Sequence, residues 1–277
     1  MDNTEQALRE RGERFRELHR GPGAFVVANA WDAGTARLLA GLGFAALATT
    51  SAGLAHSLGH RDGAGLVSRE QTLGNAAAIA AATDLPVSAD LENGFADSPE
   101  EVARTVREAA GTGIVGGSIE DTTADPDAPI HEFGLAVERV RAAAGAARAL
   151  PFPFTLTARA ENFLYGRPDL EDTVRRLRAF EEAGADVLFA PGLPDADAVR
   201  TVCAAVERPV NVLAAGAAAQ MSVAELGDLG ARRVSLGSGL SRSALTAALA
   251  AAREVAEHGT FTRMAEASTN PEIHRLL

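Results

Sequence analysis

The sequence has little cysteine, few basic residues and no long hydrophobic run, and each scarcity excludes a class of protein. Cys203 is the one cysteine among 277 residues, so a disulfide within the chain is excluded, as is typical of a reducing compartment. No apolar run approaches the roughly 20 residues of a membrane-spanning helix. The charged N-terminus also lacks the apolar core of a signal peptide. We therefore expect a soluble, cytoplasmic protein with no membrane partner.

Basic residues are outnumbered by acidic ones. The chain has 26 Lys and Arg against 37 Asp and Glu, which gives a net charge of -11. Nucleic acids are bound through clusters of Lys and Arg, so we expect no nucleic-acid partner. The hydrophobic content of 47% is enough for a sizeable core, and no low-complexity linker divides the chain. We therefore predict a single domain over residues 1–277.

Short apolar runs alternate with longer segments of helical periodicity. Eight runs are predicted as strands: 25–30, 45–50, 86–90, 116–121, 154–160, 187–191, 209–214 and 233–237. Eight strand and helix units in about 250 residues are the number that a (β/α)₈ TIM barrel needs. We expect this α/β fold, with a leading helix over 1–22, barrel strands and helices over 23–239, and a closing helix and tail over 240–277.

Polar side chains follow the first five predicted strands, where barrels of this kind build their active sites. They are Trp31 and Asp32 after the first strand, residues 49–53 after the second, Asp90 and Glu92 after the third, Glu120 and Asp121 after the fourth, and Arg159 and Glu161 around the fifth. The last three strands end mostly in Ala, Gly and Ser. The chemistry is therefore predicted on one side of the barrel rim.

Two carboxylates leave the third predicted strand together. Asp90 and Glu92 occupy alternate positions, which point to the same side, so both can face one cation. Asp62, Glu120 and Glu161 bring the rim to as many as five acids, whose mutual repulsion a divalent cation would relieve. Oxygen-only ligands favour Mg²⁺, or Mn²⁺, over zinc. Two alternatives stay open: a solvated acidic loop after the strand, and a Glu161 that pairs with an arginine.

Arg159 ends an otherwise apolar strand, where a guanidinium is costly unless it faces an anion. It is predicted to bind a substrate carboxylate or phosphoryl group, and a structural pair with a rim carboxylate is the alternative. Residues 49–53 offer successive backbone N–H groups that can form an oxyanion pocket, and a small polar turn present for steric reasons only is the alternative.

The loop over residues 121–129 contains two prolines and several acids but no apolar anchor. It is predicted to move as a lid over the site. A surface loop without a role is the alternative.

These stretches together resemble the isocitrate lyase and phosphoenolpyruvate mutase superfamily, from about residue 25 to 239. The resemblance rests on residues 29–34 (NAWDAG), 51–53 (SAG), 58–63 (LGHRDG), 90–95 (DLENGF), 119–121 (IED) and 158–161 (ARAE). It implies a (β/α)₈ barrel, usually a tetramer that exchanges a C-terminal helix between neighbouring barrels. It also implies an enzyme that uses Mg²⁺ to bind a 2-oxo acid or related carboxylate and to form a pyruvate-like enolate.

The resemblance also implies roles for individual residues. The metal-site acids are Asp62, Asp90, Glu92 and Glu120. The substrate contacts are Trp31, Asp32, Ser51, Ala52, Gly53, Arg159 and Glu161. The catalytic residues are Arg159, Asp62 and Thr122.

The lid departs from two branches of the superfamily. It has no Cys, Lys or Arg, whereas isocitrate and methylisocitrate lyases carry an acid-base cysteine there, and the mutases carry an asparagine with lysine. Thr122 and Thr123 look more like the phosphonopyruvate-cleaving or decarboxylating branches. Two hypotheses result: a Mg²⁺-dependent enzyme that acts on a carbon–carbon or phosphorus–carbon bond, and a non-catalytic barrel that binds Mg²⁺ and an oxo acid.

The end of the chain carries more apolar residues than one barrel needs. An Ala- and Leu-patterned helix over 241–257 is followed by a charged tail that contains Phe261, Met264, Ile273, Leu276 and Leu277. Exposed apolar residues of this kind dock on another surface. We predict packing against a neighbour in a homo-oligomer, a dimer or tetramer, with docking on the chain's own barrel as the alternative.

Overall fold

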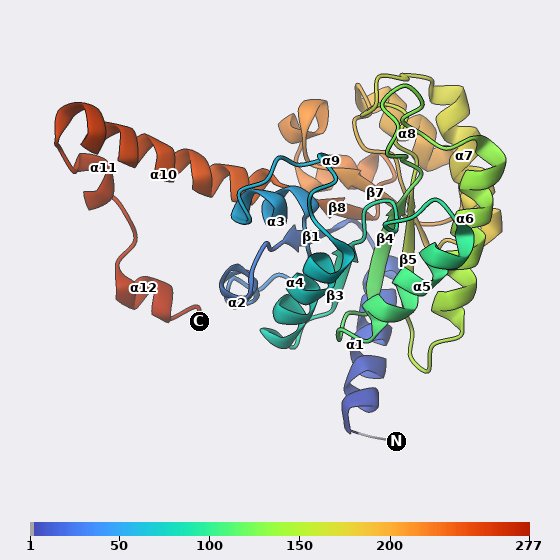
Figure 1. The fold of residues 1–277 in the computed structure, drawn as a ribbon, viewed down its shortest axis with the longest axis horizontal. Coiled ribbons are helices and arrows are strands. Elements are labelled where there is room, and N and C mark those ends of the chain that lie inside the picture. Colours follow the sequence, from blue (N-terminus) through green and yellow to red (C-terminus); the bar gives the residue numbers. More distant parts are fainter. Residues whose placement is uncertain (1–2) are drawn as a thin grey trace.

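Eight parallel strands close into one barrel in the computed structural model, which describes residues 3–277 (Figure 1). Each strand pairs with its neighbours in chain order, and β8 closes the ring by pairing with β1. The strands are β1 (Phe25–Asn29), β2 (Ala46–Ala48), β3 (Val87–Asp90), β4 (Gly116–Glu120), β5 (Thr155–Arg159), β6 (Val187–Phe189), β7 (Val210–Leu213) and β8 (Arg233–Ser235). The predicted (β/α)₈ barrel is confirmed, and each strand lies within the run that predicted it.

Helices connect the strands around the outside of the barrel. They are α2 (Ala33–Gly41), α3 (Ser51–Ser57), α4 (Arg69–Ala81), α5 (Pro99–Ala110), α6 (Phe133–Arg148), α7 (Leu170–Ala183), α8 (Ala196–Ala205), the short 3₁₀ helix η1 (Gly216–Gln220) and α9 (Val223–Asp228). The sequence did not predict α3, where a small polar turn was expected. Thr50 caps this helix, because its hydroxyl accepts the N–H of Gly53 at 3.3 Å.

Small and polar side chains point into the barrel where most barrels of this fold carry bulky branched ones. Alternate strand residues face inward, and the small buried polar residues at these positions include Asn29, Ser88, Ser118, Thr157, Asn211 and Ser235. Side chains of this size do not fill the interior. A cavity therefore extends from the rim down between the strands.

The first helix, α1 (Asn3–Arg20), closes the barrel at the end where the strands begin. Phe15 is fully buried and meets the rings of His19 and Phe25 edge to face. A Cβ atom on Gly116 would lie 2.9 Å from the Phe15 ring, so glycine is required at this contact. The helix predicted over 1–22 is thus found, and residues 1–2 of that prediction lie outside the described residues.

The last helices leave the barrel as an arm (Figure 1). α10 (Gly239–His258) projects outward and is followed by α11 (Thr262–Ala265) and α12 (Asn270–His274). The last turn comes back to α2 of the same chain, where Arg37 Nη1 lies 3.4 Å from the Leu277 carbonyl oxygen. The end of the arm thus contacts the chain's own barrel, as the alternative prediction stated. Phe261 and Met264 stay exposed. Exchange of the arm between subunits stays a prediction.

Among the helices described for residues 3–277, none is long and apolar enough to cross a membrane.

Candidate functional site

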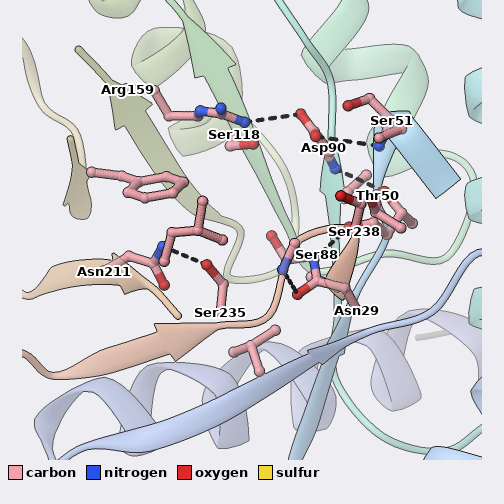
Figure 2. A pocket seen from close by; sticks show the side chains of 18 of the residues that line it. Asn29, Thr50, Ser51, Ser88, Asp90, Ser118, Arg159, Asn211, Ser235 and Ser238 are labelled. Carbon is pink, nitrogen blue, oxygen red and sulfur yellow. Dashed lines mark hydrogen bonds and ion pairs between the residues drawn. The ribbon is translucent and has the colours of Figure 1, made fainter. Parts of the chain in front are cut away.

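A cavity of about 210 Å³ opens at the C-terminal ends of the strands (Figure 2). Five of the predicted site residues line it, namely Ser51, Ala52, Asp62, Asp90 and Arg159. Pockets for drug-sized ligands span roughly 300–1,000 Å³. This cavity therefore suits a ligand of only a few carbon atoms.

The end of β3 is fixed by hydrogen bonds and is strained. The Asp90 carboxylate accepts the backbone N–H of Ser51 at 3.4 Å and that of Glu92 at 3.3 Å. In the turn that follows, Glu92 has a φ of 48° and Phe95 a φ of 59°, in the left-handed region that side chains disfavour. Such strain costs about 1–3 kcal/mol and gathers at functional sites. The backbone therefore supports a functional role for this turn.

Arg159 lies at the centre of the acid cluster. Its guanidinium is 2.6 Å from Glu161, 2.8 Å from Glu120 and 3.4 Å from Asp90, and it stacks 5.0 Å from the ring centre of Phe189. One guanidinium thus faces three carboxylates in a setting where its own side chain is only 12% exposed. The structure shows Arg159 paired with carboxylates at the rim, which was the alternative prediction for this residue. Its role as a substrate clamp stays a prediction.

The acids of the cluster hold protons more tightly than ordinary carboxyls. Burial raises the pKa of Glu120 to about 8 and that of Glu161 to about 7, and the charge of Arg159 opposes both shifts without cancelling them. Burial also raises the pKa of Glu92 to about 8, with the charges of Asp90 and Glu120 adding to the effect. A bound cation would displace these protons.

The four predicted metal-site acids lie within range of one another's charge, since Asp62, Asp90 and Glu120 all raise the pKa of Glu92. Within residues 3–277, however, no three His, Cys, Asp or Glu side chains are placed to hold a metal ion by themselves. Mg²⁺ commonly takes one or two protein carboxylates and keeps several waters. This set of oxygen donors therefore fits Mg²⁺ or Mn²⁺ bound partly through water, and it lacks the nitrogen and sulfur ligands typical of zinc sites.

Four predicted substrate contacts, Trp31, Asp32, Gly53 and Glu161, lie outside the cavity lining. Asp32 is exposed and caps α2, where its carboxylate accepts the N–H of Thr35 at 2.7 Å. Trp31 is half-buried, and its carbonyl accepts a hydrogen bond from Asn75 at 2.8 Å. Both Asp32 and Trp31 have local structural roles that their place after a strand did not reveal.

The predicted oxyanion pocket is the first turn of α3. The N–H of Ser51 is directed to Asp90 and that of Gly53 to the Thr50 hydroxyl, so these two donors already have partners. Gly53 is buried, and a Cβ on it would lie 2.8 Å from the Cβ of Trp31. Ser51 and Ala52 face the cavity, whereas Gly53 serves the close contact between the two loops.

The predicted lid has a fixed base and an exposed tip. Thr122 is buried, and its hydroxyl donates to Glu120 Oε2 at 3.1 Å. Thr122 also forms a bridge with Ile130, which closes the loop at its base. The structure therefore places Thr122 against a predicted metal-site acid. Movement of the loop tip and a catalytic role for Thr122 stay predictions.

Sequence reasoning missed the polar residues of the barrel interior. Asn29 ties three strand ends together: its amide donates to the Thr49 carbonyl at 2.7 Å, and its oxygen accepts the N–H groups of Leu236 and Gly237 at 2.9 Å. Asn211 and Arg233 were also missed. Each is a polar residue at an inward position of an otherwise apolar strand, and that pattern was the available signal.

The chain is similar to known proteins over most of its length. Residues 15–256 match the family model described as phosphoenolpyruvate phosphomutase. A crystal structure from Burkholderia cenocepacia J2315, provisionally described as a lyase/mutase, is 54% identical with a TM-score of 0.94, covering 98% of this chain and 96% of that one. An uncharacterised protein of Mycobacterium tuberculosis (strain H37Rv) is 34% identical over 88% of this chain and 89% of its own.

A third relative carries a named activity. It is the oxaloacetate decarboxylase of Bradyrhizobium diazoefficiens, which is 30% identical over 74% of this chain and 71% of its own. The match to the family model covers most of the barrel, and the closed eight-stranded barrel agrees with it. The chain therefore belongs to the phosphoenolpyruvate phosphomutase family, within the isocitrate lyase and phosphoenolpyruvate mutase superfamily of enzymes.

Proposed function

We propose that the protein is a Mg²⁺-dependent enzyme that acts on a 2-oxo acid or related carboxylate through an enolate-like intermediate. The observation that carries this proposal is the cluster of three carboxylates around Arg159 in a cavity sized for a small ligand. Strongly shifted pKa values, such as those of Glu120 and Glu161, gather at catalytic sites.

The metal-site acids and Arg159 have separate roles in this proposal. The metal-site acids Asp62, Asp90, Glu92 and Glu120 hold Mg²⁺ directly or through water. When bound, the metal supplies positive charge where negative charge develops on the substrate. Arg159 would bind the substrate carboxylate bidentately.

Two bond types are compatible with this chemistry. Cleavage of a carbon–carbon bond, in a lyase or decarboxylase, is supported by the relative named oxaloacetate decarboxylase. Phosphorus–carbon chemistry, in a mutase or hydrolase, is supported by the description of the family model. In both cases Thr122 and Asp62 are the proposed residues for proton transfer, and Thr122 lies in a lid that has no Cys, Lys or Arg.

A substrate panel tests the proposal. With Mg²⁺, the purified protein should release pyruvate from oxaloacetate, a 2-alkylmalate or phosphonopyruvate, as measured by coupled reduction to lactate. EDTA should stop the release, and added Mn²⁺ should restore it. The absence of metal-dependent pyruvate release across this panel would count against a lyase, a decarboxylase or a phosphonopyruvate hydrolase. Tight Mg²⁺-dependent binding of oxalate without turnover would support the non-catalytic alternative.

We also propose that the chain forms a homo-oligomer through its C-terminal arm. Leu249, Phe261 and Met264 are each more than half exposed, an arrangement that favours contact with another copy. Removal of residues 259–277 should therefore lower the mass measured by light scattering, and Leu249→Glu should do the same. Val223→Glu is the control, because Val223 is a 37% exposed apolar residue of α9, outside the arm. A monomer mass for the full-length chain at micromolar concentration would refute the proposal.

A further inference from the structure

Arg233, the first residue of β8, is buried inside the barrel among neutral partners. Its guanidinium donates to Asn211 Oδ1 at 2.8 Å and to Thr157 Oγ1 at 3.0 Å, and its Nη1 lies 3.5 Å from His19 Nε2. His19 Nδ1 is 2.7 Å from the Phe15 carbonyl and donates to it, so Nε2 is the acceptor that faces Arg233. Within the part of the chain that the structure describes, no carboxylate oxygen lies within the 4.0 Å of an ion pair with Arg233.

Two other buried arginines, Arg176 and Arg159, differ from Arg233 in this respect, whereas Arg139 donates to the backbone carbonyls of Asn93, Ala96 and Asp97. Arg176 pairs with Asp121 at 3.1 Å and with Asp172 at 2.8 Å, and Arg159 faces three acids. An unpaired charge inside a protein costs several kcal/mol. Burial and the charge of Arg159 lower the pKa of Arg233 to about 9, which still leaves it charged at neutral pH. The cost of burying this positive charge indicates that a bound anion compensates it.

Arg233 lines the cavity that begins at the acid cluster, although it is only 6% exposed. Ser88, Ser118 and Ser235 line the same cavity, and Figure 2 shows these hydroxyl groups around one space together with Asn211. A guanidinium carries five N–H donors, and its contacts with Asn211, Thr157 and His19 use three of them. The lower end of the cavity therefore offers a fixed positive charge, free N–H donors and hydroxyl donors.

We infer that this lower end is an anion site in which Arg233 binds the second carboxylate of a dicarboxylic ligand. Arg233 donates to Thr157, which precedes Arg159 by two residues, and these two positions are offset by about 6.6 Å along β5. This offset is on the scale of a short dicarboxylate whose other end lies among the acids. A small inorganic anion takes the same place when no ligand is bound. The inference rests on the proposed function in one respect: the proposed function identifies the chemical group at the end of the ligand that lies among the acids.

Lactate and malate test the inference, because these 2-hydroxy acids differ only in the distal carboxylate. In calorimetric titrations with Mg²⁺, the wild-type protein should bind malate at least about 10-fold more tightly than lactate. Arg233→Met, which keeps the volume, should bind the two acids equally. Arg200→Met removes an exposed arginine from α8 and should keep the preference. An unchanged preference in a folded Arg233→Met protein would show that Arg233 is structural only. These ratios are measured without turnover, so a failed substrate panel does not affect them.

A second pair of experiments does not depend on the folding of Arg233→Met. Ser118→Val narrows the cavity and leaves Arg233 in place, and it should abolish the preference for malate. In crystals of the wild-type protein soaked in bromide, anomalous scattering should place the ion against Arg233, and malate should displace it. Bromide that stays in place when malate binds would show a site for free anions alone and overturn the dicarboxylate inference. No bromide at Arg233 would overturn the anion site itself.

Discussion

Arg159→Met should lower the free energy of unfolding by about 3–5 kcal/mol at pH 8 in the presence of EDTA. The substitution keeps the volume of the side chain but removes the cation shared by Asp90, Glu120 and Glu161. Removing one partner from a buried ion pair leaves uncompensated charge, and effects of this size are typical. Denaturant unfolding of the two proteins measures the difference.

The loss should be smaller at pH 5. The pKa values of Glu120 and Glu161 are raised to about 8 and 7, above their usual value of 4.5, so both acids are protonated at pH 5 and need no cation. Because the folded state binds these protons more tightly, the stability that they contribute is lost as the pH rises through 7 and 8. An equal loss at pH 5 and pH 8 would refute this account of the cluster.

A matched control for Arg159→Met is Arg104→Met. Arg104 pairs with Glu101 and Glu108 on the exposed face of α5, where about half of its side chain is accessible. Exposed pairs contribute about 0–1 kcal/mol. A comparable destabilisation by both variants would mean that the buried position of Arg159 does not matter.

Asp90→Ala should weaken Mg²⁺ binding by about 100-fold or more while the barrel stays folded. Even residues that only support a metal ligand commonly contribute 10- to 100-fold to affinity. The substitution opens no apolar cavity, and it removes a charge that raises the pKa of Glu92. The metal-free variant should therefore stay folded, although two backbone N–H groups lose their acceptor. Calorimetric titration with Mg²⁺ measures the affinity, and an unchanged value would remove this strand end from the metal site.

Two further variants separate the contributions of Asp90. Asp90→Asn keeps an acceptor for the N–H groups of Ser51 and Glu92 but loses the charge, so it should bind Mg²⁺ as weakly as Asp90→Ala. Asp84→Ala removes a fully exposed carboxylate that pairs with Arg11 and should leave the affinity unchanged. Normal binding by Asp90→Asn would mean that Asp90 acts through its hydrogen bonds.

The sequence alone determined the barrel and the rim on which the acids gather. Strands of a parallel barrel end at one edge, so polar residues after successive apolar runs had to meet there, as Asp90, Glu120 and Arg159 do. This prediction needs only the spacing of apolar residues along the sequence and the number of apolar runs. The sequence also predicted the leading helix over residues 1–22, which closes the other end of the barrel.

Only the tertiary structure decided which side chains touch. It showed that Asp32 caps a helix, that residues 51–57 form a helix, and that the three acids surround one arginine. It also brought Arg233 to Thr157, which lies 76 positions away in the sequence. Such contacts depend on the register between strands and on the depth of burial. A local pattern cannot determine them, because they arise only when strands that are distant in the chain close into the ring.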